Sequence, residues 1–151
     1  MKEYFMKKVI EEAEKSELTE DVPIGAVIVK DSKIIARAHN LKEKNTDSTS
    51  HAEILAIKKA EKKIGDWRLT EYEMYVTLEP CAMCAGAILN SRIKKVYIGA
   101  RDFRMGACGT AIDLSNIETF NHKFDVEFGI LESECRKILS EFFSKLRNKN
   151  K

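Results

Sequence analysis

The segment Met74–Leu89 reads MYVTLEPCAMCAGAIL and decides the local fold around it. Its first five residues are apolar except for Thr77, as expected of a short strand that is buried on both faces. Pro80 suits the first turn of a helix, because its fixed φ and missing N–H are tolerated there. From Cys81 onward the segment is apolar nearly all round, which indicates an interior helix. We therefore expect the chain to pass directly from a buried strand into a central, covered helix.

Helices and strands alternate on both sides of this segment. Before it we expect a helix with its apolar face at Met6, Val9, Ile10 and Ala13, strands at Ile24–Val29 and Lys33–Ala38 joined through Asp31–Ser32, a polar loop over Leu41–Thr49, and a helix from about His51 to Lys63. After it we expect strands at Lys95–Ala100 and Phe124–Phe128 and an amphipathic last helix with apolar positions at Cys135, Ile138, Leu139, Phe142, Phe143 and Leu146. This order predicts an α/β protein with a central five-stranded mixed sheet and helices on both faces. Connections through helices should make the later strand pairs parallel.

Two short motifs carry residues of related chemistry. Ser50-His51-Ala52-Glu53 opens one predicted helix, and Pro80-Cys81-Ala82-Met83-Cys84 opens the central one. The two cysteines stand three positions apart, so both thiols face one side of a first helical turn, where the helix dipole favours the thiolate. One imidazole and two thiolates bind Zn²⁺ and leave a fourth position open for water. Because Glu53 follows His51 so closely and can move the protons of that water, the motifs predict a hydrolytic site with one zinc ion per chain.

Each motif also has a simpler interpretation. Ser50 and Glu53 fit the S-x-x-E capping box, in which the carboxylate ties down a helix N-terminus, although capping and catalysis are compatible. A C-x-x-C pair by itself is also typical of redox sites and structural zinc sites. A four-thiolate structural site would need a second close pair, but Cys108 and Cys135 are 27 positions apart. A redox pair would leave His51 without a role.

Length and composition limit the remaining possibilities. The chain has 151 residues, which fits one domain over positions 1–151. Its N-terminus mixes charged and apolar residues, and no apolar run approaches the length of a membrane span, so we expect neither a signal peptide nor a membrane partner. Four cysteines, two of them assigned to a metal, indicate a reducing compartment. We therefore expect a cytoplasmic protein.

The distribution of positive charge is more informative than its total. The formal net charge of +2 does not by itself indicate a nucleic-acid partner. Basic residues nevertheless gather in two clusters, one at Arg92, Lys94, Lys95, Arg101 and Arg104 and one at Lys145, Arg147, Lys149 and Lys151. Such clusters are typical of phosphate contacts, and equally of solvated surface lysines and a frayed C-terminus.

The motifs resemble those of one family over nearly the whole chain. The H-x-E and P-C-x-x-C pair is the signature of zinc nucleobase deaminases. Further segments are similar in order and spacing to bacterial tRNA-specific adenosine deaminases: Val22–Val29, Ala38–Asn40, Tyr75–Cys81, Met83–Ala87, Ser91–Ile93, Gly99–Asp102, Asn121–His122 and Phe142–Phe143. The chain departs from the family pattern at Ser48, where many relatives have proline, and at Phe103–Met105, where lysine and smaller residues are common. The resemblance implies a three-layer α/β/α, cytidine-deaminase-like fold.

The resemblance also implies a function, hydrolytic conversion of the wobble adenosine of a tRNA anticodon, that of an arginine tRNA, to inosine. His51, Cys81 and Cys84 would hold zinc, zinc-activated hydroxide would attack C6 of adenine, and Glu53 would shuttle protons to the ring nitrogen and the departing amine. An anticodon stem-loop suits such a pocket, because its unpaired bases can be splayed outward. Family members pair as homodimers, which we expect here as well.

The same resemblance assigns residues to RNA binding. Asn40 would hydrogen-bond the base or its ribose, although an Asn after a strand is more often a turn residue. Asp102 and Asn121 would contact the nucleotides that flank the target. Arg101 and Arg104, from the first basic cluster, would contact phosphates of the loop.

Two other functions use the same motifs. A zinc deaminase of free guanine, cytosine or their nucleosides would have the same chemistry but little dependence of binding on salt. A non-catalytic, zinc-containing RNA-binding subunit belongs to another class of protein. Glu53 argues against that class, because a structural zinc site has no use for a carboxylate beside an open coordination position.

Overall fold

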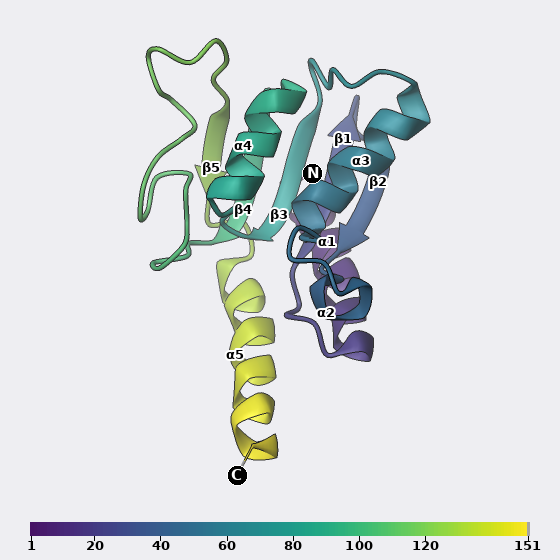
Figure 1. The fold of residues 1–151 in the computed structure, drawn as a ribbon, viewed down its shortest axis with the longest axis vertical. Coiled ribbons are helices and arrows are strands. Elements are labelled where there is room, and N and C mark those ends of the chain that lie inside the picture. The colour runs from purple at the N-terminus through teal and green to yellow at the C-terminus, as the bar shows by residue number, and fades with distance from the viewer. Residues whose placement is uncertain (151) are drawn as a thin grey trace.

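The computed structural model describes residues 1–150 (Figure 1). Its helices are α1 (Lys2–Lys15), the 3-10 helix η1 (Ser16–Thr19), α2 (Lys42–Asn45), α3 (Ala52–Ile64), α4 (Ala82–Ser91) and α5 (Glu132–Lys149). Its strands are β1 (Gly25–Lys30), β2 (Lys33–His39), β3 (Glu73–Leu78), β4 (Lys95–Ala100) and β5 (Asp125–Phe128). All five strands predicted from the sequence are confirmed, with ends that differ by one residue at most.

The strands form one mixed sheet in the order β2-β1-β3-β4-β5. β1 pairs antiparallel with both β2 and β3, whereas β3 pairs parallel with β4, and β4 with β5. The β1–β2 hairpin turns at Asp31 and Ser32, which have φ values of 50° and 61°, as a two-residue type I′ turn requires. Parallel neighbours need a crossover connection, and α4 supplies it between β3 and β4.

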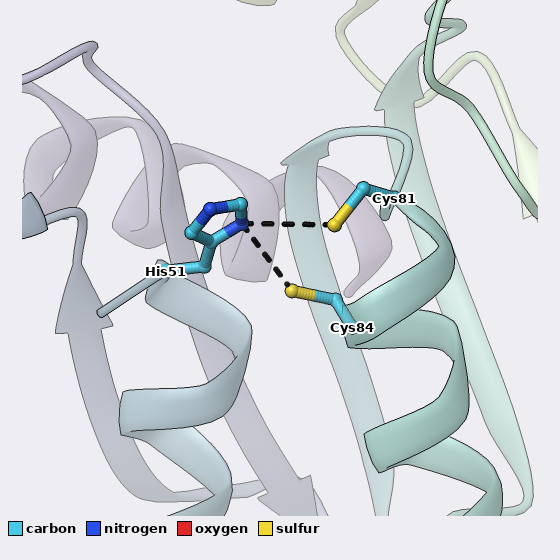
Figure 2. A group of neighbouring side chains, drawn as sticks. All are labelled: His51, Cys81 and Cys84. Atoms are coloured by element: carbon cyan, nitrogen blue, oxygen red, sulfur yellow. Dashed lines mark hydrogen bonds between the residues drawn. The ribbon is translucent and has the colours of Figure 1, made fainter. Parts of the chain in front are cut away.

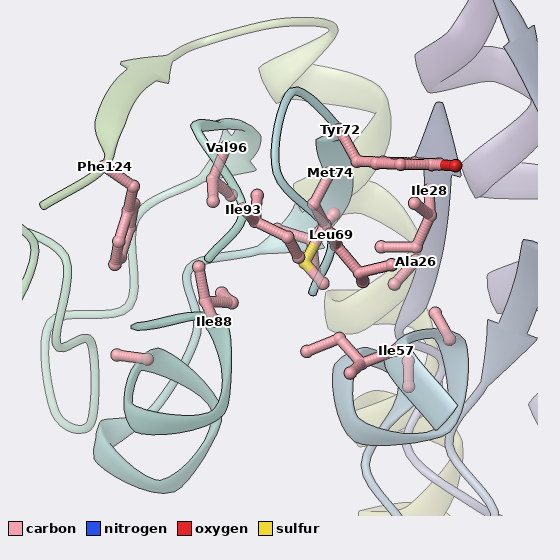
Figure 3. Packing of buried hydrophobic residues seen from close by; sticks show 14 of the residues in the cluster. Ala26, Ile28, Ile57, Leu69, Tyr72, Met74, Ile88, Ile93, Val96 and Phe124 are labelled. Atoms are coloured by element: carbon pink, nitrogen blue, oxygen red, sulfur yellow. The ribbon is translucent and has the colours of Figure 1, made fainter. Parts of the chain in front are cut away.

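Helices cover both faces of the sheet, because successive strand residues point to opposite sides. Val27 and Tyr75 pack on the face covered by α1 and by the start of α5. Ile28 and Met74 pack on the other face, beneath α3 and α4, where most of the core lies (Figure 3). The predicted three-layer α/β/α arrangement is confirmed, and it brings the starts of both motif helices to the same end of the sheet (Figure 1).

The connections differ from the prediction in two places. The polar stretch Leu41–Thr49 contains the short helix α2, whose Glu43 amide donates to the Asp21 carboxylate at 2.6 Å. Its cap therefore comes from a distant residue, which local sequence does not reveal. Residues 101–124, all within the described part of the chain, join β4 to its parallel neighbour β5 without a helix. The expectation that helices make all the later parallel connections was wrong for this pair.

Two helices are less covered than their composition predicts. Residues Cys84, Ala85, Ile88 and Leu89 of α4 are buried, but Ala82 is exposed and Met83 is 36% exposed. In α5 only Cys135 is buried among the apolar positions, and the helix extends beyond the sheet (Figure 1). Within residues 1–150, no helix combines the length and apolar character that crossing a membrane demands.

Candidate metal centre

His51 and Cys81 occupy equivalent positions at the starts of neighbouring helices. His51 is the N-cap residue of α3 and Cys81 that of α4, and both have extended backbones. Cys84 lies in the first turn of α4 and is buried. Figure 2 shows the imidazole and the two thiols pointing toward one another from the two helix starts. His51 Nδ1 lies 3.7 Å from Cys81 Sγ and 3.6 Å from Cys84 Sγ.

These separations fit a tetrahedral zinc ion. Zinc bonds of about 2.0–2.1 Å to nitrogen and about 2.3 Å to sulfur, at the tetrahedral angle, place such ligand atoms about 3.6 Å apart. The ligand atoms of His51, Cys81 and Cys84 all lie within 4.8 Å of one another, and no other group of three potential ligands lies this close among residues 1–150. Three protein donors leave one tetrahedral position to a small molecule, which is the arrangement of a catalytic zinc site.

The two thiols share one negative charge in this arrangement. A hydrogen bond from the Cys84 thiol, aided by His51 and opposed by burial, lowers the pKa of Cys81 to about 4. The same hydrogen bond, together with burial, raises the pKa of Cys84. Hydrogen bonding with Cys81 raises the pKa of His51. The cluster therefore attracts a cation, and binding one would displace the remaining thiol proton.

Glu53 lies in the first turn of α3 and is only 4% exposed. Burial raises the pKa of its carboxyl group to about 7, which suits a group that accepts and releases protons near neutral pH. The capping-box interpretation is wrong, because Ser50 is not the N-cap residue of this helix. The Ser50 hydroxyl donates to Asp47 at 2.8 Å and accepts from Asn45 at 3.2 Å instead.

Asn40 supplies the acceptor that the start of α3 needs. Its side-chain carbonyl accepts a hydrogen bond from the Ala52 amide at 2.8 Å, and its backbone carbonyl accepts one from Ser16 Oγ at 3.0 Å. The residue is 7% exposed. Within residues 1–150 the Asn40 side-chain NH₂ group has no hydrogen-bond acceptor, so it is available to a ligand beside Ala52, the residue that follows His51.

A cavity of about 660 Å³ opens beside Asn40. Its walls come from η1, α2 and the second half of α5, and include Asp21, Lys42, Phe142, Phe143 and Lys145. The wall formed by α5 is aromatic and basic, as in sites for single-stranded nucleic acid. The rest of the lining is largely acidic, with Glu17, Glu20, Asp21 and Glu43. None of the three candidate metal ligands lines this cavity, and Asn40 is the lining residue that hydrogen-bonds the start of α3. Sequence patterns missed the cavity, because the walls come from segments far apart in the chain.

The remaining predicted RNA contacts lie on the connection between β4 and β5. Arg104 is exposed, and Arg101 Nη1 donates to Thr110 Oγ1 at 3.0 Å. One Asp102 carboxylate oxygen accepts the amides of two following residues at 3.0 and 3.1 Å. Asn121 is exposed further along, and no contact among the described residues joins it to the metal-ligand cluster. The structure thus brings Asn40 to the cluster, and it holds Arg101 and Asp102 on the connection that packs beside it.

Glu79 is a buried charged residue beside the cluster, and no sequence motif pointed to it. This residue is 3% exposed, follows β3, and directly precedes Pro80. Both of its carboxylate oxygens accept hydrogen bonds from the connection that carries Asp102, from groups 23 to 31 positions away. A charged residue at the end of a buried strand was the available signal, since such a group needs donors.

Comparison with known proteins agrees with this geometry. Residues 1–147 match the model of the family described as MafB19-like deaminase. The chain is 52% identical over 149 residues to the tRNA-specific adenosine deaminase of Bacillus subtilis (strain 168), a match that covers 99% of this chain and 92% of that relative. This chain belongs to the tRNA-specific adenosine deaminase family. The family resemblance deduced from the sequence is confirmed.

Solved structures extend the comparison. A structure from work on A-to-I editing by tRNA:A34 deaminases at the wobble position is 42% identical to this family member, with a TM-score of 0.87 and coverage of 90% of this chain and 99% of that one. The guanine deaminase of Bacillus subtilis is 33% identical, with a TM-score of 0.63 and coverage of 76% and 84%. The fold is therefore shared with deaminases of a free base, and the match to the tRNA deaminase is the closer of these two.

Proposed function

We propose that this chain is a zinc-dependent hydrolase that converts the wobble adenosine of a tRNA anticodon, that of an arginine tRNA, to inosine. The observation that carries the proposal is the convergence of three metal-binding side chains with a buried carboxylate, in a chain of this family. Water is the second substrate and ammonia the second product.

His51, Cys81 and Cys84 would hold the zinc ion, one per chain. The bound ion would supply Lewis-acid activation of water. Glu53 accepts a proton from the attacking water and delivers it to N1 of adenine. It then takes the remaining proton from the new C6 hydroxyl and passes it to the amine, so that ammonia leaves as the C6 carbonyl forms. Its pKa of about 7 supports this double role, because neither protonation state is strongly favoured at neutral pH.

Recognition of the RNA would involve two regions. The side-chain NH₂ of Asn40 donates to the target nucleotide, and the cavity beside it accepts nucleotides of the unpaired loop. Asp102 and Asn121 meet flanking nucleotides, while Arg101 and Arg104 meet phosphates. The second basic cluster, at the end of α5, contributes Lys145, Arg147 and Lys149; Lys151, which we counted in that cluster, lies outside the described residues.

We also propose that the chain forms a homodimer in the cytoplasm. Ala82 and Met83 expose apolar surface on a helix that carries two metal ligands, which supports a second copy of the chain packing there. Metal-binding thiolates are maintained in a reducing compartment, which supports the cytoplasm. A single deaminase domain would extend over residues 1–151.

The test is deamination of a synthetic anticodon stem-loop by zinc-loaded protein. Inosine should appear at the wobble position, and a matched stem-loop with guanosine at that position should remain unchanged. Free adenosine, cytidine and guanine serve as competing substrates, the last because of the guanine deaminase match. Rapid turnover of free guanine without any editing of the stem-loop would contradict the proposal in favour of the free-base function.

A further inference from the structure

Four hydrogen bonds converge on the buried carboxylate of Glu79. Its Oε1 accepts from the Asp102 amide at 3.1 Å and from the Thr110 hydroxyl at 2.5 Å. Its Oε2 accepts from the amides of Cys108 and Thr110 at 3.0 and 3.1 Å. Every donor comes from the connection between β4 and β5, so one side chain fixes this loop at both ends of a nine-residue stretch, 102–110.

Only an ionised carboxylate satisfies this arrangement. All four partners are donors, and a carboxylate offers two acceptor oxygens with no hydrogen of its own. A glutamine would turn its NH₂ group toward two of these donors. Since Glu79 is 3% exposed, solvent cannot replace a lost partner.

The same loop packs directly against Glu79 and the residue after it. The Ala107 amide donates to the Pro80 carbonyl at 2.9 Å, one residue before the ligand Cys81. A Cβ atom at Gly106 would lie 2.5 Å from Glu79 Cδ and 2.6 Å from Oε1, so no larger residue fits without moving the loop. These contacts hold the loop against the segment that leads into Cys81.

Thr110 connects this buried carboxylate to a surface residue. Its hydroxyl donates to Glu79 and accepts from Arg101 Nη1 at 3.0 Å. The guanidinium of Arg101 also lies 3.8 Å from the centre of the Phe128 ring. Residues proposed to meet RNA are thus held in place through Glu79 before any RNA binds.

We propose that Glu79 is a positioning residue for substrate recognition, which holds Asp102 and Arg101 where they meet the nucleotides flanking the target adenosine. The inference rests on the proposed function of the chain. Glu79 itself is covered by the loop and acts through it. A loop held in its binding conformation avoids the entropy cost of ordering on association.

The first test substitutes Thr110, which leaves Glu79 and all metal ligands intact. Thr110→Val removes the hydroxyl that bonds Glu79 and Arg101, and Thr110→Ser retains it as the matched control. We expect Thr110→Val to raise KM for the stem-loop roughly tenfold or more, as loss of a charge-assisted hydrogen bond allows. Its kcat and its zinc content should stay close to those of the unsubstituted protein, and Thr110→Ser should restore KM.

Hydrogen exchange gives a second readout that needs no RNA. Glu79→Gln should speed amide exchange at Cys108 and Thr110, because a glutamine has one acceptor oxygen and cannot serve all four donors. Thr110→Val keeps the oxygen that accepts from both amides, so exchange there should stay close to that of the unsubstituted protein. An unchanged KM in Thr110→Val would overturn the inference. So would a loss of zinc and kcat with unchanged KM in Glu79→Gln, since Glu79 would then serve only the metal helix. Failure of the unsubstituted protein to edit the stem-loop would instead overturn the proposed function, and this inference with it.

Discussion

The side-chain carbonyl of Asn40 accepts a hydrogen bond from the backbone amide of Ala52 at 2.8 Å. This bond joins the end of β2 to the start of α3, where His51 and Glu53 lie. One side chain thereby serves two purposes, because its oxygen caps the helix while its NH₂ group stays available to a ligand.

Two substitutions at Asn40 should separate these purposes. Asn40→Ala removes the cap and the donor, so we expect loss of activity and a free energy of unfolding lower by about 1 kcal/mol. Asn40→Asp keeps the acceptor and removes the donor, so activity should fall while much of that stability remains. Chemical denaturation and stem-loop kinetics measure the two effects. Full activity in Asn40→Asp would show that the NH₂ group is not needed.

Glu53→Ala should retain fold and zinc but lose turnover. General acid–base catalysis contributes about 10² to 10⁴ in rate, and here one carboxylate serves several proton transfers. Glu53→Gln, which keeps the size of the buried side chain, is the matched variant and should be equally inactive. Zinc analysis and single-turnover kinetics give the measurements. Near-normal activity in either variant would remove Glu53 from the mechanism.

The metal should contribute to stability. If zinc binds only the folded chain, free zinc at 1,000 times its dissociation constant stabilises the fold by about 4 kcal/mol. A chelator should therefore lower the Tm of the protein, and Cys84→Ser should lower both zinc content and Tm. Cys135→Ser, at a buried cysteine of α5 outside the cluster, is the control and should retain zinc. Equal zinc content in the unsubstituted protein, Cys84→Ser and Cys135→Ser would show that Cys84 does not bind zinc.

Arg104 tests the electrostatic part of RNA binding. If its exposed guanidinium meets a phosphate, Arg104→Gln should reduce the slope of log K against log salt by about 0.7 to 0.9. Lys33→Gln removes an equal charge at the exposed start of β2, at the opposite end of that strand from His39, and should leave the slope unchanged. Fluorescence anisotropy with a labelled stem-loop at several salt concentrations measures both. Equal slopes would place Arg104 outside the interface.

Glu12 should contribute to stability in a pH-dependent way. Burial alone would raise the pKa of this carboxyl, but hydrogen bonds with Lys15 and His39 outweigh it, so its folded-state pKa lies below the ordinary 4.5. A lowered pKa means that the stabilisation is present above that ordinary value and is lost as pH falls through the folded-state pKa. The difference in unfolding free energy between wild type and Glu12→Gln should therefore shrink in acid. A difference that is constant with pH would contradict this account.

Local patterns predicted the elements of the fold, because strand and helix periodicities are properties of short segments. The pattern located β4 to the residue, and Asp31–Ser32 identified the β1–β2 turn. The same patterns did not predict the short helix α2, and they predicted that α4 is covered all round, although one part of it is exposed. The cap of α2 comes from Asp21, and an apolar helix composition does not tell which face the rest of the chain leaves exposed.

By itself, the sequence predicted Cys81 and Cys84 as candidate metal ligands, since a helical turn brings two cysteines three positions apart to one side. Only the tertiary structure decided that His51 meets them, because the imidazole lies 30 positions from Cys81 in the chain and reaches it through the packing of α3 beside α4. The roles of Glu79 and of the Asn40 cap were decided in the same way. Each depends on donors from a distant segment, and the position of that segment is set by the packed sheet and its layers rather than by neighbouring residues.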